Sequence, residues 1–430
     1  MTNTDQILLF GAGKSATTLI HYLAKICAQN QWYCTIVDIN EELVQSKIGD
    51  SPFLTAKSIP IEDEEERKLL ITNTQIVISL LPPHLHKLVA TSCLELGKHL
   101  LTASYIDDSI KMMEKEITAK GLFFLGEMGL DPGIDHMSAM QLIHSIQQKG
   151  GLIDSFKSHC GGLVAPENNN NPWKYKFSWN PRNIITAGKA GAIYKENNSI
   201  KEVNYDQIFQ DCGSVEIPSF GTLAFYPNRD SLSYAKLYEI ETAATFIRTT
   251  LRYPDFCTGW QKMVEAGFTM DDELLDTDVL SFGRFLRDRL SSKKISLNTP
   301  LLEQQFEFLG LYNNRSIHDG RKSYAAILQE LLEEKWKLEK GDKDMIVMLH
   351  EIDYTLNNQK HQVKSSLIVK GDDESNTAMA KTVGLPLGIV AKLILENKMN
   401  LTGLHIPIVE SIYKPVLMEL SAEGIRFEEN

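Results

Sequence analysis

Short apolar runs alternate with longer mixed segments over the first 125 residues of the chain. The apolar runs predict strands at residues 7–10, 35–37, 76–80, 99–101 and 122–125. Between them, apolar residues at helical spacing predict helices over 17–28 and 107–119. Strands that alternate with crossover helices are typical of a parallel sheet covered on both faces. This part of the chain therefore predicts a doubly wound α/β domain.

The pattern changes after Gly129. Glycines, asparagines and prolines interrupt residues 161–181, with aromatic residues among them, which predicts a loop-rich second domain that carries a site. From 256 to about 340 the apolar residues fall at helical spacing and predict an all-α insertion. Residues 345–354 and 363–369, joined across Asn357-Asn358, predict a β-hairpin.

Composition and charge indicate a globular protein and argue against membrane and nucleic-acid partners. The 430 residues allow two or three domains, and 43% hydrophobic with 23% charged residues is typical of a globular protein. The longest apolar runs, 76–81 and 388–395, fall far short of a membrane span, so we expect no membrane partner. The net charge of −12, from 44 basic and 56 acidic residues, disfavours binding to nucleic acid.

The N-terminal residues and the cysteines indicate the cellular compartment of the protein. Residues 1–6 are polar and the four apolar residues that follow are too few for a secretory core, so we expect a cytoplasmic protein. The six cysteines are scattered without a C-x-x-C pair, which predicts reduced thiols and no structural zinc site.

A glycine turn follows the first predicted strand. Residues 11–16 have the sequence Gly-Ala-Gly-Lys-Ser-Ala and lead into a predicted helix, which is the context of a dinucleotide fingerprint. Gly11 allows the tight turn, Gly13 lets the backbone approach a pyrophosphate, and Ala16 lets helix and strand pack closely. The helix start at Lys14 and Ser15 supplies N–H groups for the phosphates.

Two observations refine this interpretation. Gly13, Lys14 and Ser15 imitate the end of a P-loop, but that motif needs a glycine where Leu8 stands, so a P-loop is excluded. The second predicted strand ends at Asp38, whose carboxylate would bond the adenosine ribose hydroxyls. In isolation, Asp38 would be only a solvated acid after a strand.

Several longer motifs occur in one order along the chain. They are Thr102-Ala103-Ser104-Tyr105, Gly-Glu-Met-Gly-Leu-Asp-Pro-Gly-Ile-Asp-His at 126–136, Cys-Gly-Gly-Leu-Val-Ala-Pro-Glu at 160–167, Tyr-Lys-Phe-Ser-Trp at 175–179, Tyr-Pro-Asn-Arg-Asp-Ser at 226–231, Thr250-Leu251-Arg252-Tyr253 and Ala378-Met379-Ala380-Lys381. Together they resemble the saccharopine reductase family, the glutamate-forming saccharopine dehydrogenases. The resemblance covers nearly the whole chain, including the helical insertion and the tail.

The resemblance implies a fold and an activity. The fold would be a Rossmann-type doubly wound parallel sheet at 1–127 and 375–430, plus a mixed α+β substrate and dimerisation domain at 128–255 and 341–374, with the all-α insertion at 256–340. The activity would interconvert saccharopine with glutamate and 2-aminoadipate 6-semialdehyde, using a nicotinamide cofactor. The resemblance also implies a homodimer formed through the second domain.

A substrate with three carboxylates needs cations in its site. Arg229 and Arg252 stand in matching motifs and are the predicted clamps, because the planar arginine fork holds a carboxylate bidentately. Taken alone, either residue would more often form a surface ion pair. Thr250 and Leu251, in the same motif as Arg252, complete the substrate contacts that the resemblance implies.

Three residues are predicted to act at the reacting centre: Tyr105, Asp131 and Cys160. Ser104 and Tyr105 follow a predicted strand at the carboxyl edge of the sheet, where ligands of such folds bind. Asp131 precedes Pro132, which by itself predicts a helix N-cap and a proline at the first helical position. Cys160 by itself predicts a small buried side chain. The resemblance places both residues near the substrate, with Asp131 also beside the nicotinamide.

The remaining candidates concern the cofactor and acid-base chemistry. By the resemblance, Leu80, Leu130 and Trp179 contact the cofactor, together with Ser104 and Asp131. His136 and His159 are weaker acid-base candidates. His84, His86 and Cys93 have no plausible fourth ligand nearby, so the sequence predicts no metal site.

Two alternatives and one departure from the family stay open. A carboxypolyamine dehydrogenase would perform the same amine chemistry on a substrate with fewer carboxylates, and a dinucleotide-sensing binding protein would keep the fold without turnover. NADP-using family members have an arginine where this chain has Asp38. A carboxylate there repels the 2′-phosphate of NADP and bonds the free hydroxyl of NAD, so we expect NAD to be preferred and NADP to be possible.

Overall fold

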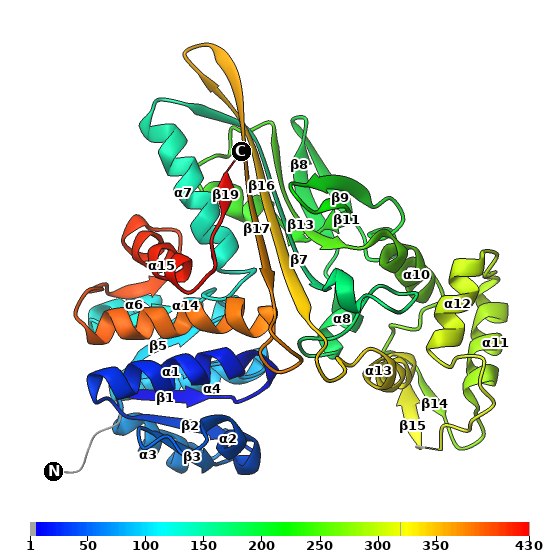
Figure 1. Ribbon diagram of the computed structural model, residues 1–430, viewed down its shortest axis with the longest axis horizontal. Helices are drawn as coiled ribbons and strands as arrows, with labels where there is room; N and C mark the ends of the chain where they lie inside the picture. Colours follow the sequence, from blue (N-terminus) through cyan, green and yellow to red (C-terminus); the bar gives the residue numbers. More distant parts are fainter. Residues whose placement is uncertain (1–5, 319, 430) are drawn as a thin grey trace. The chain divides into compact units, whose positions relative to one another are not determined.

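The computed structural model describes residues 6–318 and 320–429, which divide into two compact units (Figure 1). The first unit comprises residues 1–149 and 375–427, and the second comprises 150–374 and 428–430. Residue 127 is the predicted end of the first domain, whereas helix α7 (Ile134–Gln148) belongs to the first unit of the structure. The predicted limits at residues 1 and 430 lie outside the described residues.

A seven-stranded sheet, in which every pair of neighbouring strands is parallel, forms the centre of the first unit. Its order is β18-β6-β5-β4-β1-β2-β3. The strands are β1 (Ile7–Phe10), β2 (Cys34–Asp38), β3 (Leu54–Ser58), β4 (Ile76–Ser79), β5 (His99–Thr102), β6 (Phe123–Leu125) and β18 (Gly403–His405). The predicted strands are confirmed, and β3 and β18 are additional. In β3 only Leu54 is buried, so an apolar run does not mark this edge strand.

Helices cover both faces of this sheet (Figure 1). They are α1 (Thr17–Asn30), α2 (Glu41–Ile48), α3 (Glu64–Thr72), α4 (His86–Leu96), α5 (Asp108–Lys111), α6 (Glu114–Ala119), α14 (Ala378–Leu395) and α15 (Glu410–Ala422), with short 3₁₀ turns η1 (Lys14–Ala16) and η2 (Pro83–Leu85). One core cluster joins the sheet to α3, α4 and α6. The single helix predicted over 107–119 is two helices, α5 and α6.

The C-terminal helix α14 packs against α1. A side chain at Gly384 would meet the Leu19 Cβ at 2.9 Å, and one at Gly388 would meet the Tyr22 ring at 2.6 Å. These glycines therefore allow the close approach of the two helices. By length and hydropathy α14 could also cross a membrane, but 72% of it is buried inside the structure, as in the core helix of a globular protein.

A mixed ten-stranded sheet forms the centre of the second unit. Its main path is β10-β11-β13-β7-β16-β17-β19, in which only the β13–β7 pair is parallel. The strands of the path are β7 (Leu152–Val164), β10 (Gly213–Ile217), β11 (Gly221–Pro227), β13 (Thr245–Arg252), β16 (Asp344–Leu356), β17 (Gln359–Lys370) and β19 (Glu428–Glu429), and β8 (Ala192–Glu196), β9 (Ser199–Val203) and β12 (Arg229–Asp230) lie off it.

The predicted hairpin is confirmed as β16 and β17. Its turn residues Asn357 and Asn358 have φ values of 52° and 62°. Two successive positive φ values are typical of a type I′ turn, which asparagine tolerates well. The last described strand, β19, pairs with Ser365 and Ser366 of β17, so these final residues belong to the second unit rather than to the cofactor domain.

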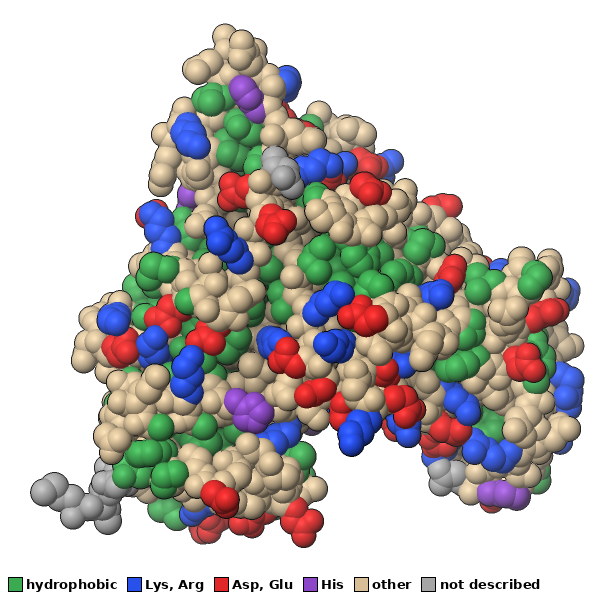
Figure 2. Space-filling view, viewed as in Figure 1, with side chains coloured by type: hydrophobic (Ala, Val, Ile, Leu, Met, Phe, Trp, Pro, Cys, Tyr) green, Lys and Arg blue, Asp and Glu red, His purple; other side chains and the backbone are tan. Residues whose placement is uncertain are grey.

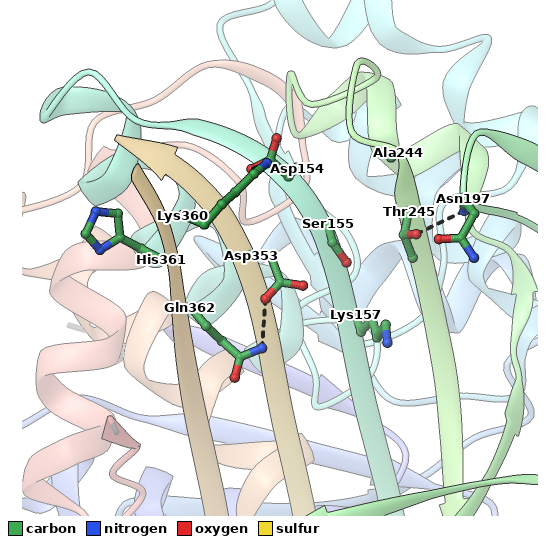
Figure 3. Close-up of a pocket in the computed structure, with 10 residues that line it drawn as sticks. All are labelled: Asp154, Ser155, Lys157, Asn197, Ala244, Thr245, Asp353, Lys360, His361 and Gln362. Carbon is green, nitrogen blue, oxygen red and sulfur yellow. Dashed lines mark hydrogen bonds and ion pairs between the residues drawn. The ribbon is translucent and has the colours of Figure 1, made fainter. Parts of the chain in front are cut away.

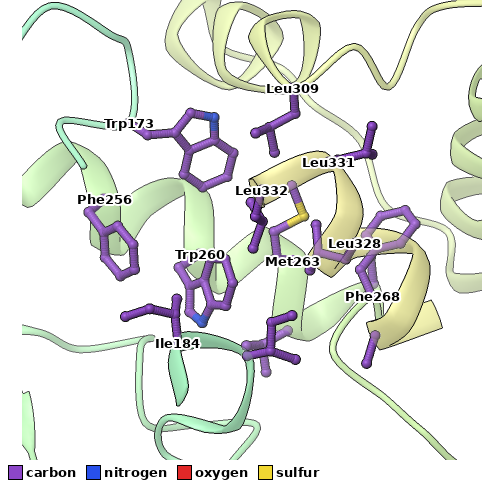
Figure 4. Close-up of a cluster of buried hydrophobic side chains, with 14 of the residues drawn as sticks. Trp173, Ile184, Phe256, Trp260, Met263, Phe268, Leu309, Leu328, Leu331 and Leu332 are labelled. Atoms are coloured by element: carbon purple, nitrogen blue, oxygen red, sulfur yellow. The ribbon is translucent and has the colours of Figure 1, made fainter. Parts of the chain in front are cut away.

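The predicted helical insertion packs around a cluster of large aromatic side chains (Figure 4). Its helices are α10 (Pro254–Glu265), α11 (Phe282–Lys293), α12 (Pro300–Phe308) and α13 (Tyr324–Lys335), and the smaller helices of the unit are α8 (Arg182–Thr186), α9 (Leu232–Leu237) and η3 (Pro166–Asn168). The insertion is not entirely helical, because β14 (Leu274–Asp276) and β15 (Arg321–Ser323) form a two-stranded sheet. Trp173, Trp260 and Trp336 are fully buried in the cluster.

Candidate active site

The glycine turn of the first unit leaves room for a ligand. Gly11 has φ +98°, and a Cβ there would meet the Leu80 carbonyl oxygen at 2.8 Å. At Gly13 a Cβ would meet no atom within 4 Å, and the residue is exposed. Ala16 is buried between the turn and the sheet, while Lys14 is exposed at the start of η1. The turn therefore offers open backbone beside a helix start, which fits a dinucleotide pyrophosphate.

Asp38 and Lys47 hold this turn from the side of β2 and α2. Asp38 Oδ2 accepts a hydrogen bond from the Ala12 N–H at 2.8 Å, and Oδ1 accepts one from the Asn40 N–H at 3.2 Å. Lys47 Nζ donates to the carbonyl oxygens of Ala12 and Gly13, both at 2.7 Å. Burial lowers the pKa of Lys47, although the Asp38 charge acts to raise it.

Lys47 was not among the residues predicted from the sequence. Its only signal is a basic residue in the last turn of the helix after Asp38, and such residues are common at helix ends. Each carboxylate oxygen of Asp38 has a second lone pair, so the residue retains acceptor capacity for ribose hydroxyls.

Ser104, Tyr105 and Asp131 lie beyond the carboxyl end of β5. The Tyr105 hydroxyl donates to Asp131 Oδ1 at 3.5 Å, so the structure brings these two predicted residues together. The Ser104 Oγ lies 2.8 Å from His86 Nε2, a contact that the sequence did not predict. Leu80 follows β4 and donates its N–H to the Phe10 oxygen at 2.8 Å, next to the glycine turn.

Asp131 does not cap a helix, contrary to the reading of Asp131-Pro132 as an N-cap and a first helical residue. The Asp131–Pro132 peptide is cis, and α7 begins only at Ile134 with Gly133 as its N-cap. The Gly133 N–H bonds instead to Asp135 Oδ1 at 2.6 Å. Asp131 is half-buried and does not act as the N-cap of α7, whereas its neighbour Leu130 is buried.

His136 is a satisfied core residue within α7. It is fully buried, and its Nε2 lies 3.0 Å from Glu127 Oε2. His159 of the second unit is also buried, with Nδ1 at 2.7 Å from Thr249 Oγ1. His159 Nε2 lies 3.4 Å from Glu351 Oε2, and this contact contributes most to holding the pKa of Glu351 at about 2. Both histidines thus have structural partners.

In the second unit, Arg252 is a buried cation among neutral groups. It is 4% exposed, and its guanidinium lies 5.5 Å from the ring centroids of both Tyr175 and Phe256. Nη1 donates to the Leu251 oxygen at 2.8 Å, while Nε is buried without a partner. No carboxylate among the described residues forms an ion pair with it.

The phenols around Arg252 provide no counter-charge. Burial raises the pKa of Tyr226 to about 12 and raises the pKa of Tyr175, so both are neutral near pH 7. Tyr226 hydrogen-bonds to Thr250, and the thiol of Cys160 is close enough to influence Arg252 electrostatically. A buried, uncompensated guanidinium is well suited to bind an external carboxylate.

The Trp179 side chain lies in the group around Arg252, whereas the Leu251 side chain does not. Trp179 is half-buried and donates from Nε1 to the Tyr175 hydroxyl at 3.1 Å, so it belongs to the group around Arg252. The Leu251 side chain packs with Leu163 in a separate core cluster, so only its backbone is at the cation. The structure thus brings Cys160, Thr250, Arg252 and Trp179 into one region.

The backbone does not place Arg229 next to the residues around Arg252. It is exposed on β12 with φ 52°. The Asn228 N–H bonds to the Arg248 oxygen, which lies four residues before Arg252, or about 13 Å along β13. Lys176, in the motif that contains Trp179, forms a buried ion pair with Asp342 at 2.6 Å and is therefore engaged structurally.

A hollow of about 630 Å³ lies elsewhere on the second unit, between the polar ends of β7, β13, β16 and β17 (Figure 3). None of the predicted site residues lines it. Its acids are already paired, Asp154 with Lys360 at 2.9 Å and Asp353 with Gln362 at 2.7 Å. Acidic and basic side chains are also interspersed over the face drawn in Figure 2. Within residues 6–318 and 320–429, no cluster of His, Cys, Asp and Glu could hold a metal ion.

Family models match both parts of the chain. Residues 7–125 match the saccharopine dehydrogenase NADP binding domain, and residues 129–425 match the saccharopine dehydrogenase C-terminal domain. A solved structure, apo histidine-tagged saccharopine dehydrogenase (L-Glu forming) from Saccharomyces cerevisiae, has a TM-score of 0.90 at 29% identity and covers 99% of both chains.

Curated relatives fall into two lengths. Alpha-aminoadipic semialdehyde synthase of Arabidopsis thaliana is 34% identical over 100% of this chain, which spans only 45% of that protein. Saccharopine dehydrogenase [NADP(+), L-glutamate-forming] of Schizosaccharomyces pombe is 30% identical and is covered over 98% of both chains. The chain thus spans about half of the longer relatives and nearly all of the shorter ones. With both domain models matched in order and a relative aligned over its full length, this chain belongs to the saccharopine dehydrogenase family.

Proposed function

We propose that the protein oxidises saccharopine to L-glutamate and 2-aminoadipate 6-semialdehyde. The secondary amine of saccharopine loses a hydride and a proton to become an imine, and water then cleaves the imine to the aldehyde and the amino group of glutamate. The bound nicotinamide cofactor supplies the hydride acceptor, and in the reverse direction the hydride donor. The proposal places this chain among the oxidoreductases of lysine metabolism, in agreement with the names of its relatives.

The main support for the proposal is the buried guanidinium of Arg252. A buried guanidinium without a carboxylate partner is costly unless a ligand compensates it. Saccharopine has three carboxylates, and one of them can accept the planar fork of Arg252 in a bidentate pair. The neighbouring Tyr175 and Phe256 rings exclude water, which strengthens such a pair. Arg229, Thr250 and the Leu251 backbone are proposed to bind the rest of the substrate.

Tyr105 and Asp131 are proposed to handle the proton of the reacting amine. Their 3.5 Å contact allows a carboxylate to accept a proton while the phenol orients it. Cys160 is proposed to lie by the reacting carbon, and its influence on Arg252 supports a place beside the substrate carboxylate. Ser104 is proposed to hydrogen-bond the substrate or the cofactor.

We further propose that Asp38 makes NAD the preferred cofactor, with NADP also usable. The relatives are named for NADP(+), so the preference concerns this chain alone. Its support is local: the acidic Asp38 ends β2, and the nearby Lys47 already donates to two carbonyl oxygens of the turn. Gly11, Gly13 and the helix start after them are proposed to bind the pyrophosphate.

The test is a spectrophotometric assay of the purified protein with saccharopine and each of NAD and NADP. Appearance of the reduced cofactor at 340 nm, together with glutamate, is the expected result. A parallel assay with a carboxypolyamine addresses the related dehydrogenase activity, and a silent protein that still binds cofactor would favour a sensing role. A homodimer and a cytoplasmic location stay predictions.

A further inference from the structure

His86 connects two serine hydroxyls at the carboxyl edge of the parallel sheet. Its Nδ1 lies 2.8 Å from the Oγ of Ser79, the last residue of β4, and its Nε2 lies 2.8 Å from the Oγ of Ser104. His86 is 3% exposed and Ser79 is fully buried. Ser104 is half-buried. The three side chains thus form one chain of hydrogen bonds from the interior of the first unit to a candidate site residue.

Local structure explains the position of the imidazole. The Pro82-Pro83 sequence after β4 leads into η2, and His86 is the first residue of α4. Burial lowers the pKa of His86 to about 4, with Asp107 raising it and His84 lowering it further, so the ring is neutral near pH 7. A neutral imidazole has one donor and one acceptor nitrogen. One of the two serine hydroxyls therefore accepts a hydrogen bond from the ring, and the other donates one to it.

The backbone of Ser104 is fixed independently. Its N–H donates to Thr102 Oγ1 at 3.2 Å, and its oxygen accepts from the Glu127 N–H at 2.9 Å. The remaining freedom of Ser104 is rotation of its side chain, and the contact with His86 Nε2 removes it. With one hydrogen bond to His86, the Ser104 hydroxyl has its remaining hydrogen-bonding position in a fixed orientation, where it can contact a ligand.

We propose that His86 is a positioning residue that orients the Ser104 hydroxyl for the substrate or cofactor, an inference that rests on the proposed function. The imidazole itself does not touch the reacting atoms. His86 orders the Ser104 side chain before the ligand binds. The hydrogen bond from Ser104 to the ligand therefore forms without a further loss of side-chain entropy.

Two isosteric substitutions separate this role from simple packing. In His86→Gln the side-chain amide reaches the position of Nε2 and keeps a partner for Ser104. In His86→Asn the amide reaches only the position of Nδ1 and keeps a partner for Ser79. Each variant leaves one hydroxyl without its histidine partner. Because Ser79 is fully buried and Ser104 is half-buried, thermal unfolding is expected to show at least as large a loss of stability in His86→Gln as in His86→Asn. We expect kcat/KM for saccharopine to fall about tenfold in His86→Asn and less than about threefold in His86→Gln.

The Ser104→Ala background gives the second readout. There, adding His86→Asn should cause little further loss of kcat/KM, because the group that His86 orients is absent. Equal losses in the Asn and Gln variants, or losses that add in the double variant, would overturn the proposal.

Cofactor binding distinguishes failure of this inference from failure of the proposed function. If the parent protein oxidises no saccharopine, the proposed activity is wrong. The dissociation constant of reduced cofactor, followed by fluorescence, then tests the positioning role: weaker binding in His86→Asn than in His86→Gln supports it, and equal binding refutes it.

Discussion

Arg252 should be a residue whose removal weakens catalysis while leaving the fold as stable or more stable. In Arg252→Met the guanidinium is replaced by an apolar side chain that can still pack against Tyr175 and Phe256. Loss of one partner from a buried charge pair costs about 2 to 5 kcal/mol. We therefore expect kcat/KM for saccharopine to fall by roughly 30-fold to several thousand-fold.

The stability effect has the opposite sign. In the free protein, burial of the Arg252 charge is offset by two ring contacts at 5.5 Å and one hydrogen bond to the Leu251 oxygen, with Nε left unsatisfied. Replacement of buried ionic groups by apolar residues of similar size is often neutral or stabilising by about 1 to 4 kcal/mol. The free energy of unfolding of Arg252→Met should therefore equal or exceed that of the parent.

The assay combines thermal unfolding of the ligand-free protein with steady-state kinetics. Arg289→Met is a matched control, because Arg289 also lies over an aromatic ring, Tyr324 at 4.0 Å, but forms an ion pair with Glu273 at 3.7 Å. That variant should lose stability and keep kcat/KM. A large loss of stability in Arg252→Met, or a normal kcat/KM, would show that Arg252 serves the fold and not a substrate carboxylate.

Four further predictions concern the proposed site and the assembly of the protein. Arg229→Met should lower kcat/KM with saccharopine by less than Arg252→Met does, because Arg229 is exposed, and should leave cofactor binding unchanged; normal kinetics would show that Arg229 does not bind the substrate. Asp131→Asn should reduce the rate and alter its pH profile without the loss of a helix cap, and parental values in both would exclude it from proton transfer. The parent should prefer NAD over NADP by at least about tenfold in kcat/KM, and Asp38→Arg should erode that preference; equal use of both cofactors would contradict the role of Asp38. Light scattering at micromolar concentration should show a homodimer, and a monomer would refute that prediction.

The apolar pattern was sufficient for the main elements but not for weakly patterned ones. The buried strands of the first unit and the hairpin with Asn357 and Asn358 were predictable because burial and positive φ demand specific residue types. Strand β3, with one buried residue, and the three-residue strands β14 and β15 gave no comparable signal. The pair Asp131-Pro132 by itself predicts a helix N-cap and a first helical residue, but α7 begins only at Ile134, with Gly133 as its N-cap.

The sequence predicted candidate site residues only where a motif contains them, and it gave no signal for residues that enter the site through tertiary contacts. Lys47 and His86 act through atoms that are far away in sequence, the Ala12 and Gly13 carbonyls and the Ser104 hydroxyl. A single lysine in a helix or a histidine after two prolines has no distinctive spacing. Likewise, the prediction of Arg252 as a clamp came only through the family motif. That no carboxylate of residues 6–318 and 320–429 pairs with it is a property of the folded chain.

We propose that Asp38 couples the cofactor choice of this protein to the shape of the glycine turn. The same carboxylate that would meet the ribose also accepts the Ala12 N–H, and Lys47 donates to the Ala12 and Gly13 oxygens of the same turn. An arginine at this position, as the family resemblance implies for NADP-using members, could not accept that N–H, so the turn would need another acceptor. Asp38→Arg should therefore weaken NAD binding through both the lost ribose contact and the loosened turn. Its gain for NADP should be smaller than charge reversal alone predicts, and the Asp38→Asn variant, which keeps an acceptor for Ala12 without the charge, separates the two effects.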